Sequence, residues 1–393
     1  MLETWRWFGP NDSIALQKIA QAGAKGIVSA LHDIPTGEVW PLGEIEAHKH
    51  LIEAAGLSWS VIESIPVHND IKTRTGHYQT YVDNYRQSII NAGKAGVRTV
   101  CYNFMPVVDW TRTSLTYSLA NASQALRFEM TDFAAYDVFI LRRARAREEY
   151  SDEVLARAET RFEAMSEADK ALLEKNIIAG LPGGEGSYTR DSIRSAIQQF
   201  TDLGTEGLRS HLNAFLQAIV PVAEDAGVKL CIHPDDPPFS LFGLPRVVST
   251  AEDARRLLAA APSPANGLTL CAGSYGARGD NDLVAMAGEF GPRIHFVHLR
   301  NVIREHDGSF YESDHLAGDN DMVGLINALL CEERRRVAAG QRDCAIPMRP
   351  DHGHLLADEI GTPGLKPGYS YIGRLKGLAE LRGVIHALDA TLR

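Results

Sequence analysis

The sequence lacks the features that would place the protein in a membrane or on a nucleic acid. It has no run of about 18 apolar residues, the length that a helix needs to cross a bilayer, and no charged-then-apolar secretory signal at its start. Its 40 Lys and Arg are outnumbered by 50 Asp and Glu, and the densest basic cluster, residues 142–147, runs directly into Glu148 and Glu149. Because a nucleic-acid groove needs a concentrated basic face, we expect neither a membrane nor a nucleic acid as a partner.

Cysteine is also scarce, and its spacing argues against a disulfide framework. The five cysteines are Cys101, Cys231, Cys271, Cys331 and Cys344, an odd number with no CxxC pair. Reduced thiols in a cytoplasmic protein fit this pattern best, so we expect a cytoplasmic location. A cysteine with a special role is then a metal ligand or a nucleophile rather than half of a bridge.

What the sequence does contain is a repeated unit of helix, Ala-Gly and short apolar run. It occurs as IAQAG before GIVSAL, IEAAG before LSWSVI, NAGKAG before VRTVCYNF and AEDAG before VKLCIHP. The glycines of these units, Gly23, Gly56, Gly96 and Gly227, stand where a helix end favours the left-handed conformation. The short apolar runs suit strands buried on both faces, and strands that alternate with helices predict parallel pairing.

Eight such strands are predicted along the chain. They cover residues 4–8, 26–31, 57–65, 98–105, 228–234, 268–273, 294–301 and 345–351, with helices between them, for example at 251–261 and 283–289, and a last helix at 371–392. Eight strand–helix units predict an α/β fold of the (β/α)8 TIM barrel type rather than an open sheet.

One stretch breaks this rhythm. About 120 residues separate the fourth and fifth predicted strands, far more than one crossover helix needs, and residues 125–180 are rich in Ala, Glu and Arg. We interpret residues 114–187 as a helical insertion within a single domain of residues 1–393, followed by a helix at 190–225 that leads to strand five. We expect the insertion either to cover the site or to contact another subunit. Because of the second possibility, we expect the protein to be a homo-oligomer. A separate small domain is the alternative.

The candidate metal ligands follow from the rule that such barrels carry their catalytic groups at the C-terminal ends of the strands. The last four predicted strands end in His233, Cys271, His298 and Asp351. A lone cysteine is usually a small core residue, but four donors on neighbouring strands predict one shared metal site. The mixed nitrogen, sulfur and oxygen set favours Mn²⁺, Fe²⁺, Co²⁺ or Zn²⁺. Because strand side chains alternate, His295 and Cys231 are interpreted as packing residues.

Further candidates surround these four. His352 follows Asp351 and is placed for proton transfer, with orientation of the metal ligands as its alternative role. A Gly- and Pro-rich loop after strand eight carries Tyr369 and Tyr371, either of which suits a phenol presented to a substrate. The candidate substrate contacts are Arg6, His68, Asn103, Arg300 and Asn301, each of which is equally suited to a structural role in a loop.

These motifs resemble those of a known family. The segments CIHPDDPP, LCAGSYG, HLRN and RPDHG, with WFGPND and DIPTGEVWP nearer the start, resemble the mannonate dehydratases of hexuronate degradation that have a xylose-isomerase-like barrel. The resemblance covers nearly the whole chain. It implies Mn²⁺ or Fe²⁺ held by His233, Cys271, His298 and Asp351, with His352 and Tyr369 as catalytic residues. The loop is longer than the family pattern, so Tyr371 remains an alternative to Tyr369.

The reaction that the resemblance implies is removal of water from D-mannonate to give 2-keto-3-deoxy-D-gluconate. The sugar acid is then the expected small-molecule partner. A metal-dependent sugar isomerase or epimerase is the first alternative, although such sites favour carboxylate ligands and often a lysine. A metal-dependent phosphodiesterase is a weaker alternative, since such sites usually hold more than one metal. A third alternative is a barrel that binds a ligand without catalysing a reaction.

Overall fold

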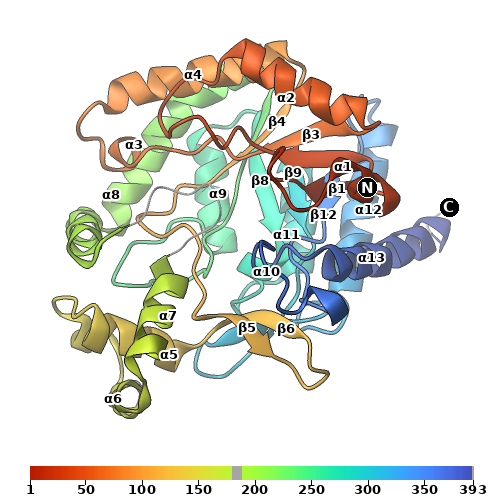
Figure 1. Ribbon diagram of the computed structural model, residues 1–393. Coiled ribbons are helices and arrows are strands. Elements are labelled where there is room, and N and C mark those ends of the chain that lie inside the picture. The colour runs from red at the N-terminus through yellow and green to blue at the C-terminus, as the bar shows by residue number, and fades with distance from the viewer. Residues whose placement is uncertain (179–187, 392–393) are drawn as a thin grey trace.

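The computed structural model describes residues 1–178 and 188–391, and eight parallel strands at its centre close into a barrel (Figure 1). The strands are neighbours in the order β1-β12-β9-β8-β7-β4-β3-β2. Their bounds are β1 (Leu2–Arg6), β2 (Gly26–Ser29), β3 (Ser58–Glu63), β4 (Thr99–Tyr102), β7 (Lys229–Ile232), β8 (Asn266–Cys271), β9 (Ile294–His298) and β12 (Pro347–Arg349). Each predicted strand overlaps one of these, so the expected (β/α)8 TIM barrel is confirmed.

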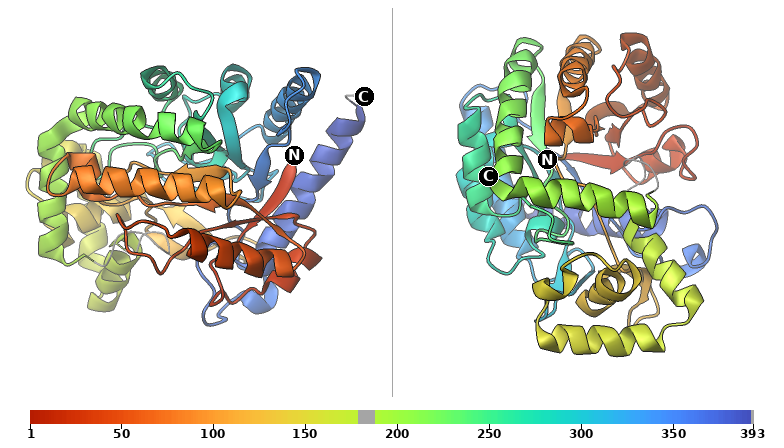
Figure 2. Two further views of the ribbon diagram at one scale, coloured as in Figure 1. Left: turned by 90° about the horizontal axis from the view of Figure 1, so that it is seen from above. Right: turned by 90° about the vertical axis from the view of Figure 1, so that its left-hand side faces the viewer.

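Helices surround the barrel, as the two views of Figure 2 show. They are α1 (Leu16–Gln21), α2 (Leu42–Ala54), α3 (Asn69–Thr73), α4 (Tyr78–Lys94), α8 (Arg190–Asp225), α9 (Ala251–Ala260), α10 (Ala272–Tyr275), α11 (Leu283–Phe290), α12 (Met322–Ala338) and α13 (Tyr371–Thr391). Short 3₁₀ turns lie at Gly291–Arg293 and Ala357–Glu359. The four glycines that end the repeated units have φ between +64° and +88°, the left-handed conformation that the sequence predicts.

The barrel interior is packed with side chains from five strands. Val28, Val61, Cys101, Cys231 and Phe296 form one buried cluster, so Cys231 is a core residue as expected. Their burial removes the apolar side of each strand from water and fixes which side chains of the strand face inward.

The outer face of β9 is packed as well. His295 next to Phe296 points away from the barrel interior, is 5% exposed, and has Nε2 3.0 Å from the carbonyl oxygen of Pro264. The alternation of side chains along β9 thus separates His295 from His298.

A second, antiparallel sheet lies beside the barrel and was not anticipated from the sequence. Its strands β5 (Ser114–Ser118), β6 (Gln124–Phe128), β10 (Val302–Arg304) and β11 (Phe310–Glu312) have the order β10-β11-β6-β5. One hairpin comes from the long segment after β4 and the other from the segment after β9, and β6 pairs with β11. The segment that was expected to be helical therefore begins with two strands.

The remainder of that segment, as far as the described residues reach, is mainly helical. It contains α5 (Met130–Ala135), a π-helical turn (Tyr136–Ile140), a 3₁₀ turn (Ala146–Glu149), α6 (Asp152–Ala164) and α7 (Glu167–Ile178). Figure 1 shows α5, α6 and α7 on the same side of the barrel as the small sheet. The long α8 then returns to the barrel and is broken at Gly204, where φ is +68°. No helix within the described ranges is long and apolar enough to span a bilayer.

Candidate active site

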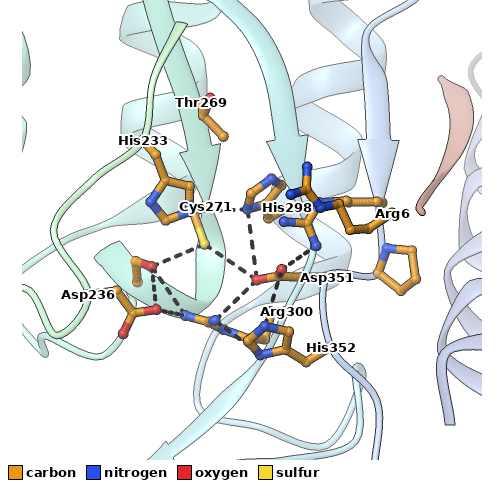
Figure 3. A network of polar contacts seen from close by, with 12 residues as sticks. Arg6, His233, Asp236, Thr269, Cys271, His298, Arg300, Asp351 and His352 are labelled. Carbon is orange, nitrogen blue, oxygen red and sulfur yellow. Dashed lines mark hydrogen bonds and ion pairs between the residues drawn. The ribbon is translucent and has the colours of Figure 1, made fainter. Parts of the chain in front are cut away.

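Four side chains with metal-binding atoms meet at one end of the barrel (Figure 3). Cys271 and His298 are the last residues of β8 and β9, His233 follows β7 directly, and Asp351 lies two residues beyond β12. These four strands are consecutive in the barrel. Because parallel strands present their C-terminal ends at one rim, the chain brings the four side chains to one place.

The distances among the four fit a single metal ion. The ligand atoms of His233, Cys271 and His298 all lie within 4.8 Å of one another. The carboxylate atom Oδ2 of Asp351 lies 3.8 Å from both the Cys271 sulfur and Nδ1 of His298. Two imidazole nitrogens, a sulfur and a carboxylate oxygen form the mixed donor set that a divalent transition metal prefers.

The hydrogen bonds of the two imidazoles support this fit. Nδ1 of His233 lies 2.7 Å from the Pro234 carbonyl oxygen, and Nε2 of His298 lies 3.2 Å from a carboxylate oxygen of Glu63. Each of these nitrogens faces an acceptor, which favours the tautomer that carries the ring proton there. The other two nitrogens, Nε2 of His233 and Nδ1 of His298, are only 3.2 Å apart. Two lone pairs at this separation repel each other, and a cation bound by both removes the repulsion.

Arginines hold Asp351 in its ionised form. Arg349 donates to Oδ1 of Asp351, and Arg300 Nη1 lies 3.1 Å from Oδ2. Burial alone would raise the pKa of Asp351, but Arg349, His352, His298 and Arg300 together lower it well below its usual range. The Asp351 backbone has φ of +69°, a conformation that costs a non-glycine residue about 1 kcal/mol or more.

His352 adjoins this cluster and contacts the small sheet. Its Nδ1 lies 2.8 Å and 3.0 Å from the two carboxylate oxygens of Glu312, the last residue of β11. Its Nε2 lies 3.8 Å from Asp351 Oδ1. The rings of Trp110 and Tyr369 stand edge-on to the imidazole, with centroids 6.1 Å and 4.9 Å away. His352 is therefore fixed on several sides.

The structure separates the two tyrosines of the loop after β12. Tyr369 lines the cavity beside the four donors and is 5% exposed. Burial raises the pKa of its hydroxyl to about 12. Tyr371 begins α13 and donates its hydroxyl to the carbonyl oxygen of Lys18, 3.0 Å away. Of the two tyrosines, Tyr369 is the one that lines the cavity.

The candidate substrate contacts also fall into two groups, those that line the cavity and those that do not. Arg6, Asn103 and Arg300 line the cavity. His68 instead caps α3 by accepting from the Asp70 amide at 3.0 Å, and its ring stacks on Tyr81.

Asn301 also points away from the cavity. Its side-chain amide donates to the carbonyl oxygens of His315 and Asn320, at 3.0 Å and 3.2 Å. The loop that begins at Asn301 is thus tied together by this side chain, which is the structural alternative considered for it.

Several cavity residues were missed in the sequence. Those with ionisable groups include Glu63, Lys72, Asp236 and Arg349, and Glu312 contacts His352 from β11. Glu63 ends β3, and Arg349 precedes Asp351 by two residues, so strand ends and alternation gave a signal for both. Glu312 had none, because a strand of three residues leaves no recognisable pattern.

Comparison with known proteins accounts for the whole chain. The family model described as D-mannonate dehydratase (UxuA) matches residues 1–393. The mannonate dehydratase of Saccharophagus degradans is 77% identical over 393 residues, which is 100% of this chain and 99% of that protein. Mannonate dehydratase 2 of Agrobacterium fabrum is 58% identical, with 100% and 98% covered.

Comparison with solved structures points to the same family. The crystal structure of mannonate dehydratase from Streptococcus suis serotype 2 has a TM-score of 0.79 at 34% identity, covering 100% of this chain and 94% of that chain. A D-tagatose 3-epimerase-like protein, at 12% identity and a TM-score of 0.52, shares the fold alone. The closed eight-stranded barrel of this chain is thus shared with a mannonate dehydratase of known structure. From the matching family model and the relatives over its full length, the chain belongs to the D-mannonate dehydratase family.

Proposed function

We propose that this protein is a metal-dependent hydro-lyase that removes water from D-mannonate to give 2-keto-3-deoxy-D-gluconate in hexuronate degradation. Its family membership supports the reaction and the substrate. The observation that carries the proposal is the convergence of His233, Cys271, His298 and Asp351 beside a cavity that also holds His352 and Tyr369.

We assign the four converging residues to one divalent metal, Mn²⁺ or Fe²⁺. A thiolate and two imidazoles suit these borderline metals better than Mg²⁺ or Ca²⁺, which prefer oxygen. A bound divalent cation would supply stabilisation of the negative charge that develops when the proton next to a carboxylate is removed. The Pro234 carbonyl orients His233 by accepting a hydrogen bond from Nδ1–H, and the Glu63 carboxylate faces Nε2 of His298.

Two residues are proposed to move protons. Dehydration removes the proton from C2 and adds one to the hydroxyl that leaves C3. With its pKa raised to about 12, Tyr369 keeps its proton near neutral pH and is the proposed donor to the leaving hydroxyl. His352 lines the same cavity and is the proposed acceptor of the C2 proton through Nε2, since its Nδ1 faces Glu312.

Substrate oxygens are proposed to bind to three further side chains of the cavity, Arg6, Asn103 and Arg300. Arg6 is 7% exposed, and its Nη1 has no hydrogen-bond partner among the described residues, which leaves a donor for a polar ligand. Asn103 and Arg300 are the other proposed contacts, since both line the cavity. For His68 and Asn301 we propose structural roles, in the cap of α3 and in the loop after β9.

We further propose one domain, a homo-oligomeric assembly and a cytoplasmic location. Barrel residues and insertion residues such as Phe133 and Leu173 belong to one apolar core, which supports a single domain with the insertion inside it. Leu172 on α7 is 56% exposed and marks the insertion as a candidate subunit contact. All five cysteines are free, as expected for a reducing compartment.

The decisive test is the dehydration of D-mannonate by metal-stripped protein to which Mn²⁺ or Fe²⁺ is returned. Wild type and Cys271→Ser are compared, with Cys231→Ala in the barrel core as the matched control. We expect metal-dependent formation of the keto acid by wild type and by the control, and a loss of more than about 100-fold in Cys271→Ser. No product from metal-loaded wild type would refute the dehydratase proposal and favour isomerisation.

A further inference from the structure

Beside His352 lies a closed ring of four buried charges. Arg112 Nη1 donates to Asp236 Oδ1 at 2.7 Å, and Arg300 Nη2 donates to Asp236 Oδ2 at 2.6 Å. Glu312 Oε1 lies 3.3 Å from Arg112 Nη2 and 3.5 Å from Arg300 Nη1. Asp236 and Arg300 of this ring are seen next to His352 and Asp351 in Figure 3. Two guanidinium groups thus face two carboxylates, and the charges balance.

His352 and the two arginines of the ring together determine the charge of Glu312. Burial alone would raise the pKa of this carboxyl, but His352, Arg300 and Arg112 outweigh burial and lower it. Glu312 is therefore a carboxylate, which can only accept hydrogen bonds.

His352 Nδ1 lies between two groups with opposite requirements. The Glu312 carboxylate, at 2.8 Å and 3.0 Å, requires an N–H at Nδ1, whereas Arg300 Nη1, at 3.4 Å, would require a lone pair there. The Glu312 contacts are shorter, and Arg300 Nη1 already has Asp351 Oδ2 at 3.1 Å. The geometry selects the tautomer with Nδ1–H, which leaves the lone pair of a neutral ring on Nε2.

We propose that Glu312 is a positioning residue that holds His352 in this tautomer, with Nε2 free to accept a proton from the substrate. The inference rests on the proposed dehydration. It gives the small sheet a role in the reaction, because β11 brings Glu312 to His352 and pairs with β6 of the insertion. Arg112, two residues before β5, pairs with Glu312 and favours its ionised form, and Asp236, in the segment after β7, holds Arg112 in place.

The test is Glu312→Gln, which keeps the shape of the side chain. An amide can donate as well as accept, so it permits the other tautomer, in which Nε2 carries the proton. The matched control is Glu305→Gln in the turn of the same hairpin, where the carboxylate pairs with Arg127. Both variants and wild type are loaded with Mn²⁺, and kcat, KM and metal content are measured with D-mannonate and with its C2-deuterated form.

We expect Glu312→Gln to lose about 100-fold in kcat, with KM changed by less than about threefold and with unchanged metal content. Its kcat with the deuterated substrate should show a clear isotope effect, because C2 proton removal has become the slow step. Glu305→Gln should match wild type. A kcat near the wild-type value, a change confined to KM, a parallel loss of metal, or a lowered kcat without an isotope effect would each overturn the role of Glu312.

A second variant covers the case in which Glu312→Gln does not fold. Glu312→Asp keeps the charge that balances Arg112 and Arg300, but its shorter side chain withdraws the carboxylate from Nδ1. We expect the same fall in kcat, and full activity would overturn the inference. Wild-type protein that forms no keto acid would instead refute the proposed function, so the two failures are distinguishable.

Discussion

The two halves of the barrel mouth present different kinds of side chain. The consecutive strands β7, β8, β9 and β12 carry the four proposed metal ligands, and His352 follows the last of these strands. The half made by β1, β2, β3 and β4 contributes Arg6, Glu63 and Asn103 to the same cavity. We infer that the first half holds the metal and moves protons, whereas Arg6 and Asn103 of the second half bind substrate together with Arg300 from the first. Substitutions in the two halves should therefore fail in different ways.

The largest effect is expected at Asp351. Asp351→Asn keeps the shape of the side chain, and asparagine tolerates the left-handed backbone, but the metal loses its carboxylate and Arg349 its counter-charge. We expect a loss of metal content and more than about 100-fold lower activity. Asn103→Ala, in the other half of the mouth, should keep its metal, as measured by atomic emission spectrometry. Equal metal loss in both variants would contradict this assignment of the two halves.

The two tyrosines of the loop after β12 provide the next test. Tyr369→Phe removes the proposed proton donor and should lower kcat by about 100-fold or more, since general acid catalysis is worth about that much. Tyr371→Phe loses only a hydrogen bond to the Lys18 carbonyl and should retain near wild-type kcat. Steady-state kinetics on D-mannonate decide between them, and a larger loss in Tyr371→Phe would reverse the assignment.

A smaller effect, and one on binding, is expected at Arg6. Arg6→Lys keeps the charge but loses the planar fork of donors and the Nη1 atom, which has no hydrogen-bond partner among the described residues and lies 3.8 Å from a Glu63 carboxylate oxygen. We expect KM to rise about tenfold, as for one charge-assisted hydrogen bond, while kcat and metal content stay close to wild type. Arg98→Lys, exposed at the other end of the barrel, is the control. A fall in kcat without a change in KM would instead indicate that Arg6 takes part in catalysis rather than in substrate binding.

The smallest effect concerns stability and His295, the buried histidine on the outer face of β9. Burial lowers the pKa of His295 to about 3, so between that value and about pH 6.5 the unfolded chain binds one proton more than the folded chain. The contribution of His295 to the free energy of unfolding is therefore fully present at neutral pH. It decreases as the pH is lowered, by about 2 kcal/mol at pH 5. Urea unfolding of His295→Gln should show a weaker loss between pH 7 and pH 5. His306→Gln, at an exposed site, should behave as wild type.

The sequence predicted the barrel and the neighbourhood of its site because both follow from short-range patterns. Strands buried on both faces leave continuous apolar runs, helix-ending glycines divide the units, and alternation separates His298 from His295. Strand ends then place Cys271 and Asp351 at one rim without further information.

The parts that were missed depend on contacts between distant segments. β6 and β11 are short and pair across about 180 residues, so no local pattern marks them as strands. The side chains of His68 and Asn301 follow strands as expected, but both turn to backbone groups nearby. Position along the chain predicts which rim a residue reaches, whereas the direction of its side chain is set by tertiary contacts.

The four-charge ring has a consequence for how this protein can vary in evolution. Arg112, Asp236, Arg300 and Glu312 come from four different segments, and together they carry no net charge. A change of one of them leaves a buried charge without its counterpart, at a cost of about 3–5 kcal/mol. The loops around them can lengthen or change composition more freely. Natural variants should therefore inherit the four positions as a set, or exchange one arginine together with one carboxylate.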